Sequence, residues 1–275
     1  MIDSFEIYLP LDASASVREK ACNLSQQVGW PICDQISWPH LASSDSSKQT
    51  LDEAECAFFE YLDDKLLLRL ELNGAPQQLS FDLGEGEAGL RAVRASKSNE
   101  ILARAIGCKP HYRPDVIDAT AGMGRDSLIM ASLGCQVNMQ ERNPAIFQLL
   151  SNALTRFQLK DSVSGDQTKS GIAERLSLHQ LDGGKGQFAT DAAAVIYLDP
   201  MFPQRKKSAL VKKEMRLFKR LAGDDLDSDQ LLLNALASAS NRVVVKRPKG
   251  APFLADKSPS HQVVSKNFRY DVYLV

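Results

Sequence analysis

The sequence contains no apolar run long enough to cross a bilayer, and its N-terminus, MIDSFEIYLPLDAS, has no positive segment followed by an apolar one. We therefore expect neither a membrane span nor a secretory signal. The four histidines are far apart, without the spacing of a metal site. The cysteines are scattered and include no Cys-x-x-Cys pair: Cys22, Cys33, Cys56, Cys108 and Cys135. This pattern argues against a disulfide framework and a zinc site, so we expect a cytoplasmic protein with neither a metal nor a membrane partner.

The chain also has almost no net charge, because 33 Lys and Arg oppose 34 Asp and Glu to give a formal net charge of −1. Any strongly basic surface must then be local and balanced by acid elsewhere, so its position in the sequence is informative. The 275 residues, 44% of them hydrophobic, are enough to bury the core of one large domain or of two unequal ones.

The sequence pattern changes near residue 95. Residues 1–95 contain short strand-like runs, FEIYL and KLLLRLEL, and the segment LLLRLELNGAPQQLSFDL predicts a hairpin with a longer loop. From residue 98, SNEILARAIG has apolar residues at helical spacing and ends at Gly107. We expect a small N-terminal α+β subdomain over 1–95 and a larger domain over 96–275.

Strands and helices alternate in the larger domain. Strands are expected in DVIDA, CQVNMQE, RLSLHQLD, AAVIYLD, NRVVVKRP and FRYDVYLV, with helices such as DSLIMASL and PAIFQLLSNALTRF between them. This order predicts an α/β fold with helices on both faces of a mostly parallel sheet, in which ligands bind outside the carboxyl ends of the strands. Four acids lie at or just after such ends: Asp118, Glu141, Asp182 and Asp199.

The first of these strands leads into the turn DATAGMGRD, where Gly122 and Gly124 lie between a strand and a helix. Glycine there allows a tight turn and the close approach of a ligand, although many such connections use glycine only to turn. Glu141, about 20 residues further on, has the spacing of an acid that binds two ribose hydroxyls. Together the turn and the acid predict a cofactor that contains a nucleoside.

The residues after the turn favour S-adenosylmethionine over a dinucleotide. A dinucleotide fingerprint has a third glycine where this chain has Ser127. Asp126 could cap the helix, and it would disfavour a pyrophosphate at the helix N-terminus. A positively charged sulfonium suits this acidic site better. Asp182 could accept the adenine amino group, or it could be only a turn residue before Gly183 and Gly184.

The fourth strand ends in the segment Asp199-Pro200-Met201-Phe202-Pro203. Its two prolines restrict the backbone, so we expect a stiff loop that projects the Asp199 carboxylate and the Phe202 ring toward the edge with the glycine turn. A carboxylate that accepts N–H bonds, beside a ring that stacks on a base, fits methylation of an exocyclic amine. A plain proline-rich loop is the alternative. We predict Asp199, Pro200 and Phe202 as the catalytic residues.

The next segment is strongly basic, with eight Lys or Arg and one acid, Glu214, between Arg205 and Arg220. Ser208 could begin and Gly223 could end a helix there. Such residues most often form a solvated face, but the scarcity of acid and the position after Asp199 favour a surface that binds phosphates of a nucleic acid. The predicted RNA contacts are Arg205, Lys206, Lys207, Lys212, Lys213, Arg216, Lys246 and Arg247.

The segments DATAGMGRDSL, ERNP, YLDPMFP…KKSALVKKEMR and RVVVKRP, in that order, resemble the RsmJ family of small-subunit ribosomal RNA guanine-N2 methyltransferases. The resemblance covers residues from about 95 to the end of the sequence. It implies a Rossmann-like class I methyltransferase core with a seven-stranded sheet, and S-adenosylmethionine as the methyl donor. The implied acceptor is a guanine of 16S ribosomal RNA, naked or within the small ribosomal subunit. Related amine methyltransferases usually carry a second proline where this chain has Met201.

The resemblance also implies cofactor contacts by position. It adds Arg125 and Arg142 to the acids and glycines identified above. The predicted cofactor site is then Asp118, Gly122, Gly124, Arg125, Asp126, Glu141, Arg142, Asp182, Gly183 and Asp199.

Three other functions stay open at this point. Methylation of adenine N6 uses the same loop chemistry. A nicotinamide-dependent oxidoreductase explains the glycine turn and Glu141, but it gives the Asp199 loop and the basic segment no role. An RNA-binding assembly factor with a lost cofactor site is hard to reconcile with the intact Gly122, Gly124, Glu141 and Asp199.

Overall fold

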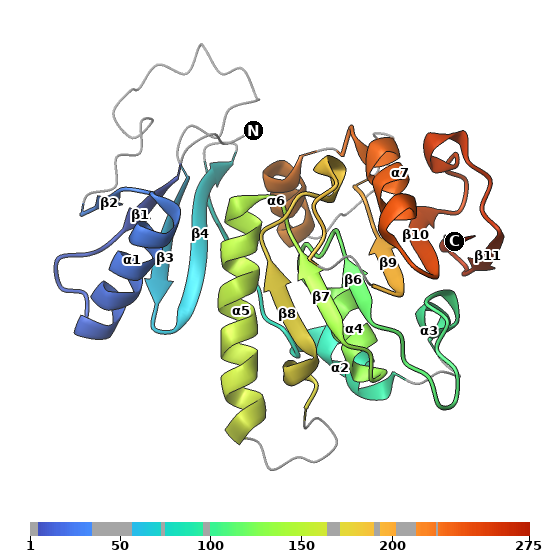
Figure 1. Ribbon diagram of the computed structural model, residues 1–275. Helices are drawn as coiled ribbons and strands as arrows, with labels where there is room; N and C mark the ends of the chain where they lie inside the picture. The colour runs from blue at the N-terminus through green and yellow to red at the C-terminus, as the bar shows by residue number, and fades with distance from the viewer. Residues whose placement is uncertain are drawn as a thin grey trace. The chain divides into compact units, whose positions relative to one another are not determined.

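The computed structural model describes residues 5–34, 57–72, 75–95, 100–163, 171–189, 193–201, 213–223 and 225–275 (Figure 1). The chain divides into two compact units, Met1–Phe81 with Val211–Leu221 and Asp82–Leu210 with Ala222–Val275. Residues 82–95 thus group with the larger unit and 211–221 with the smaller one, while the domain boundary at residue 95 stays a prediction. Within the described ranges, no helix is both long and apolar enough to cross a membrane.

The smaller unit contains a five-stranded sheet of order β2-β1-β3-β4-β5. β1 pairs in parallel with β2 and β3, whereas β3–β4 and β4–β5 are antiparallel. The unit therefore has the predicted α+β composition. Its elements are β1 Glu6–Tyr8, α1 Ala15–Val28, β2 Ile32–Cys33, β3 Ala57–Leu62, β4 Lys65–Leu72, β5 Ala75–Leu79 and all but the last residue of α6 Lys213–Ala222.

The β4–β5 pair is the predicted hairpin, with a shorter connection than expected. Leu72 lies opposite Ala75, so only residues 73 and 74 separate the two strands. Elsewhere in the sheet, Trp30 stacks on Phe59 with the ring centroids 4.8 Å apart. Because Trp30 follows α1 and Phe59 belongs to β3, this contact fixes the end of that helix on the sheet.

The predicted basic helix is present as α6. Gly223 ends it in the left-handed region, with φ +72. Leu217 and Phe218 are buried and Arg216 is exposed. The proposed cap, Ser208, lies outside the described residues.

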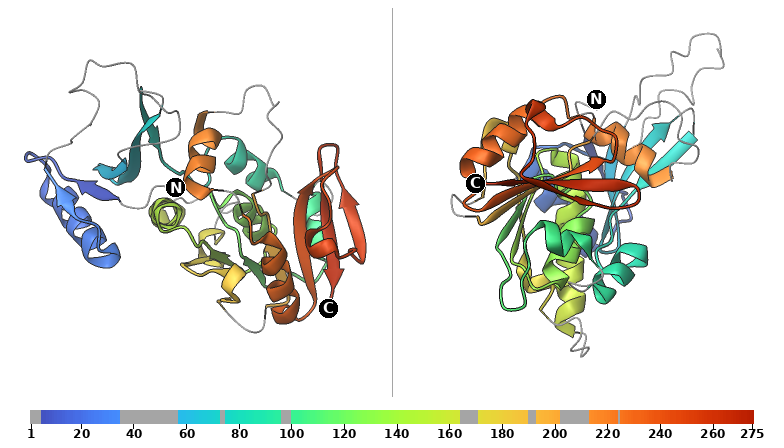
Figure 2. Two further views of the ribbon diagram at one scale, coloured as in Figure 1. Left: turned by 90° about the horizontal axis from the view of Figure 1, so that it is seen from above. Right: turned by 90° about the vertical axis from the view of Figure 1, so that its right-hand side faces the viewer.

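The larger unit holds a seven-stranded sheet of order β11-β12-β10-β9-β6-β7-β8 (Figure 1). β10, β9, β6, β7 and β8 pair in parallel, and β12 is antiparallel to both of its neighbours, so the sheet is mostly parallel, as predicted. Figure 2 shows β11 and β12, drawn in red, at one edge. The strands are β6 Val116–Asp118, β7 Val137–Gln140, β8 Leu176–His179, β9 Val195–Leu198, β10 Arg242–Pro248, β11 His261–Val264 and β12 Phe268–Leu274.

Two details of this sheet differ from the prediction. β8 ends at His179, three residues before Asp182, because the chain then turns into a short 3-10 helix. β11 was not among the strands read from the sequence. It is only four residues long, and His261, Gln262 and Val264 are exposed, so it carries no alternating pattern.

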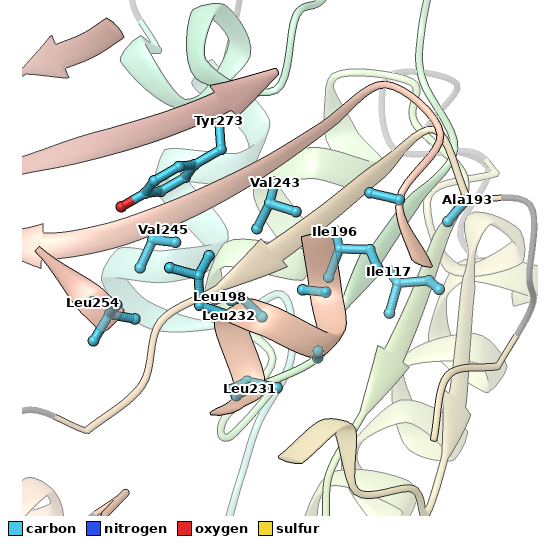
Figure 3. Close-up of a cluster of buried hydrophobic side chains, with 13 residues drawn as sticks. Ile117, Ala193, Ile196, Leu198, Leu231, Leu232, Val243, Val245, Leu254 and Tyr273 are labelled. Carbon is cyan, nitrogen blue, oxygen red and sulfur yellow. The ribbon is translucent and has the colours of Figure 1, made fainter. Parts of the chain in front are cut away.

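Helices cover both faces of the sheet, as predicted. The helices are α2 Gly86–Arg94, α3 Ile101–Ala105, α4 Arg125–Ser132, α5 Pro144–Val163 and α7 Ser228–Ser238, with 3-10 turns η1 Ala173–Arg175, η2 Gly183–Lys185 and η3 Leu254–Asp256. On one face, Leu232 and Ala235 of α7 lie in a fully buried cluster with Ile196, Val243 and Val245 (Figure 3). Each large side chain buried in this way contributes about 1.5–3 kcal/mol, so the cluster holds β9 and β10 in fixed positions.

The opposite face is covered by α4, against which α2 packs. The first turn of α4 contacts the sheet through polar side chains. Asp126 accepts a hydrogen bond of 2.6 Å from the hydroxyl of Tyr197 in β9, and the hydroxyl of Ser127 donates to Asp118 at the end of β6. These bonds fix the start of α4, and with it the glycine turn, against two neighbouring strands.

Candidate active site

The glycine turn after β6 depends on both of its glycines. Gly122 and Gly124 have φ of +54° and +70°, in the region that side chains disfavour. A Cβ at Gly124 would lie 2.9 Å from both Leu150 and Leu83, so the core beneath the turn also leaves no room for one. The backbone amide of Gly122 donates to Glu141 at 3.1 Å, which joins the turn to the end of β7.

Asp118 braces this turn from inside. It is 2% exposed, and its carboxylate accepts hydrogen bonds from the amide of Thr120 and the hydroxyl of Ser127. Burial raises its pKa to about 7. Because both of its oxygens are bonded inside the fold, Asp118 shapes the site from behind.

Glu141 lies directly after β7, next to the turn. Its two oxygens accept from the amides of Gly122 and of Asn143, the latter at 2.7 Å. Burial raises its pKa to about 7, against the effect of these two donors. A carboxylate with this placement, one strand away from a glycine turn, is what binding of ribose hydroxyls requires.

Arg142 connects the end of β7 to the loop before α7. Its guanidinium donates to Asp227 at 2.7 Å and to Asp225, and it lies 4.0 Å from Asp182. Asp225 in turn accepts from the backbone amide of Met201, two residues after Asp199. The network therefore runs from Arg142 through Asp225 to the loop that carries Asp199.

Asp182 caps the turn η2 that follows β8, accepting from the amide of Gly184 at 3.0 Å. Asn234 of α7 donates to the carbonyls of Gly183 and Gly184. Both residues of the predicted pair, Asp182 and Gly183, thus lie in a turn held by α7 and by the Arg142 network.

Asp199 follows β9 and lies at the same edge as the glycine turn. Its backbone amide donates to the hydroxyl of Thr120 at 2.6 Å. Its carboxylate accepts from the ammonium of Lys246 at 2.8 Å. Pro200 and Met201 follow in the described chain, and Phe202 lies outside it. The predicted convergence of the acid loop and the glycine turn is therefore present for Asp199.

Lys246 also bonds Asp126 at 2.7 Å, so it stands between two carboxylates. Asp126 does not cap α4, since Gly124 holds that position. Partial withdrawal from water raises the pKa of Asp199, an effect that Lys246 opposes. Burial acts in the same direction on Asp126, but the Lys246 ammonium and the Tyr197 hydroxyl outweigh it and lower the pKa of Asp126.

The predicted RNA contacts fall in three groups. Arg205, Lys206, Lys207 and Lys212 lie outside the described residues, and for Lys213 the structure describes the helical backbone alone. Arg216 is exposed on α6. Lys246 faces the acids, and Arg247 is 4% exposed and donates to the carbonyl of Pro252. The role of these two residues in RNA binding stays a prediction.

Four residues of this site received no functional role in the sequence analysis. Thr120 stood in the glycine segment without a role, and Tyr197 was read only as part of a strand. Asp225 and Asp227 lie just after Gly223, which ends the basic helix. Acids that follow a strongly basic segment could have been identified as partners for a cation. Among the described residues, no group of three or more His, Cys, Asp or Glu is placed to hold a metal ion.

The residues present fit S-adenosylmethionine. The turn with Gly122 and Gly124 brings backbone close to the edge, and the acceptors Glu141 and Asp182 follow the next two strands, β7 and β8. Asp126 puts a carboxylate in the first turn of α4, where a dinucleotide-binding fold places a pyrophosphate. These acceptors suit a nucleoside with a cationic sulfur rather than a phosphate.

Comparison with known proteins supports the same cofactor. A family model described as a SAM-dependent methyltransferase matches residues 44–275. A solved SAM-dependent methyltransferase from Neisseria gonorrhoeae aligns over 98% of this chain and 95% of its own, with a TM-score of 0.66 and 28% identity.

Curated relatives are more similar in sequence. The chain is 43% identical to Ribosomal RNA small subunit methyltransferase J of Stutzerimonas stutzeri over 225 residues, which are 82% of this chain and 85% of that protein. It is 50% identical to the protein of the same name from Haemophilus ducreyi over 198 residues, 71% of this chain and 76% of that protein.

Proposed function

Because this chain belongs to the SAM-dependent ribosomal RNA small subunit methyltransferase J family, we propose that it methylates the exocyclic N2 amine of a guanine in small-subunit ribosomal RNA. S-adenosylmethionine supplies the methyl group from its sulfonium. The substrate is 16S ribosomal RNA or the small ribosomal subunit, which makes the enzyme cytoplasmic.

One observation carries the proposal for the site. The backbone amide of Asp199 is bonded to Thr120, inside the segment that contains the glycine turn. This bond holds the start of the acid loop next to the glycine turn, which supports placing the Asp199 carboxylate near the methyl donor. A methyl donor in the turn and an amine held by Asp199 would then meet at that edge.

The cofactor would be held mainly by groups that face the edge. We assign the turn of Gly122 and Gly124 to the methionine part, Glu141 to the ribose, and Asp182 with Gly183 to the adenine. Arg125, exposed at the start of α4, would contact the cofactor from the solvent side of the site. Asp118, Asp126 and Arg142 are hydrogen-bonded to other side chains, whereas Glu141 and Asp182 accept hydrogen bonds from backbone amides, so we assign the first three to supporting these contacts.

The acceptor would be held by the Asp199 loop. The Asp199 carboxylate accepts an N–H of the amine and directs the nitrogen lone pair at the methyl group. Transfer to the neutral amine would leave the nitrogen with a positive charge, and it would then release one proton to solvent water. Pro200 restricts the loop, and Phe202 would stack on a guanine that has left its helix, offsetting part of a cost of about a few kcal/mol.

The ribosomal RNA itself would be held by the basic segment, through Arg205, Lys206, Lys207, Lys212, Lys213 and Arg216. Contacts of this kind bind phosphates of any sequence and weaken with salt. They would therefore add affinity, whereas the Asp199 loop would select the base.

The direct test is transfer of labelled methyl from S-adenosylmethionine to small ribosomal subunits that lack the modification, followed by nucleoside analysis. The proposal predicts label in N2-methylguanosine. Label in N6-methyladenosine would show that the acceptor base is adenine and not guanine. If neither naked RNA nor subunits were labelled, the proposal would be contradicted.

A further inference from the structure

Lys246 occupies the centre of the acid cluster at the site edge. Its ammonium lies 2.7 Å from Asp126 and 2.8 Å from Asp199, and its side chain is 26% exposed. The ring of Phe268 lies 5.7 Å from the same nitrogen. In the β10–β12 ladder, Lys246 is directly opposite Tyr270, which is fully buried. The side chain is thus enclosed by rings and held by two acids.

The acid partner on the inner side is itself anchored. Asp126 belongs to the first turn of α4 and accepts a second hydrogen bond from Tyr197, which is 1% exposed. Asp199, by contrast, is the more exposed acid, and among the described residues Lys246 is the group that bonds its carboxylate. Lys246 therefore ties the more exposed carboxylate of the pair to the one that is anchored by Tyr197.

We propose that Lys246 is a positioning residue for methyl transfer: it orients the Asp199 carboxylate from the fixed Asp126 and keeps it ionised to accept the N–H of the acceptor amine. The proposal rests on the proposed function, because it assigns a role within the same site. It replaces the role in RNA binding that the sequence predicted for Lys246.

The charges around Asp199 explain why a cation is needed there. The charged and titratable groups near enough to influence the carboxylate electrostatically are Asp126 of α4, Asp118 of β6, Tyr197 of β9, Lys246 of β10, Tyr270 of β12 and Asp225 before α7. Arg91 of α2 faces Asp126 and Tyr270, and is paired with Glu100. Within the described part of the chain, Lys246 is therefore the cation in direct contact with Asp199, against three acids.

Removing the Lys246 ammonium should change the pKa of Asp199 in a predictable direction. Without Lys246, the neighbouring carboxylates raise the pKa of Asp199 further, because like charges disfavour ionisation. Protonated Asp199 no longer accepts an N–H bond at both oxygens. The form competent for transfer is then present only at higher pH, so the acid side of the pH–rate profile moves upward.

The test compares single-turnover methyl transfer to small ribosomal subunits between pH 5.5 and 9, with S-adenosylmethionine at saturation. For Lys246→Met we expect a rate about 100-fold lower at neutral pH, and an acid limb shifted up by about one pH unit or more. KM for the subunit should stay within about two-fold. Lys246→Arg keeps the charge and should keep the acid limb at its wild-type position.

The matched control is Lys257→Met, which removes the same charge from an exposed position of the same unit. Its profile should match the wild type. Calorimetry with S-adenosylhomocysteine verifies that each variant is folded. Should Lys246→Met not fold, Lys246→Gln removes the charge while keeping a hydrogen-bond donor, and it carries the same expected shift.

Two results would separate the possible errors. If Lys246→Met raises KM and weakens the salt dependence of binding while the acid limb stays in place, Lys246 is a phosphate contact and the inference is wrong. If the wild type itself transfers no methyl group, the proposed function fails instead.

Discussion

The backbone amide of Asp199 and the hydroxyl of Thr120 are joined by a hydrogen bond of 2.6 Å. Thr120 belongs to the turn after β6 and Asp199 to the loop after β9, which are neighbouring strands of the sheet. The bond therefore fixes the distance between the part of the edge that suits a methyl donor and the carboxylate that suits an amine. Loss of that fixed distance affects the rate more than the affinity.

Replacing Thr120 with Val removes this acceptor at nearly constant volume. We expect the single-turnover rate of methyl transfer to fall about 10-fold and the protein to lose about 1 kcal/mol of stability. Thr120→Ser keeps the hydroxyl and should retain most of the rate. Equal rates for Val and Ser would show that the bond does not position the loop.

Replacing Gly124 with Ala should destabilise the larger unit. The backbone has φ +70 there, and the new Cβ would lie 2.9 Å from Leu150 and Leu83. We expect a loss of about 2–3 kcal/mol in urea unfolding, from strain and overpacking together. Gly250→Ala, where a Cβ meets nothing within 4 Å, is the control and should change stability by less than about 0.5 kcal/mol.

Glu141 should make stability depend on pH. Its folded pKa of about 7 lies above the ordinary 4.5, so the folded protein retains a proton that the unfolded chain releases. The protonated Glu141 therefore stabilises the folded state below pH 4.5, and this stabilisation is lost as the pH rises to about 7. The loss amounts to at most about 3 kcal/mol. Asp118, whose pKa is also raised to about 7, changes the stability in the same direction. Urea unfolding of Glu141→Gln should show a shallower dependence across that window. An unchanged slope, matching that of the exposed Glu174→Gln, would contradict the assignment.

Arg142 should matter for stability through the acids it joins. Arg142→Met leaves Asp225 and Asp227 without their cation and loosens the bond to Met201. We expect a loss of about 1–3 kcal/mol, together with a lower transfer rate. The matched control is Lys160→Met, which breaks an exposed pair with Glu85 and should cost about 0.5 kcal/mol or less. A similar small loss for both variants would show that the Arg142 network is not structural.

Much of the larger unit was predictable from local sequence. Apolar runs identified β6, β9 and β10, because a buried parallel strand is largely apolar. The acids Asp118, Glu141 and Asp199 marked the ends of β6, β7 and β9 as the ligand-binding edge. The same reasoning placed Asp199 beside the glycine turn, and the Asp199–Thr120 bond agrees with it.

The partners of the charged side chains were not predictable. Lys246 and Asp126 are 120 residues apart in the sequence. They meet only because α4 packs on the face of the sheet to which Tyr197 of β9 and Lys246 of β10 point. The sequence shows Lys246 next to Arg247 in a basic motif, so both were read as RNA contacts. One faces the acid cluster and the other is buried, a difference set by the alternation of side chains along β10.

The central claim is that Asp199 holds the acceptor amine at the edge shared with the methyl donor. It is tested most directly by single-turnover methyl transfer to unmodified small ribosomal subunits by Asp199→Ala, with S-adenosylhomocysteine affinity measured on the same sample. We predict a rate below detection while S-adenosylhomocysteine still binds measurably. Near-normal turnover in this variant would contradict the role assigned to Asp199.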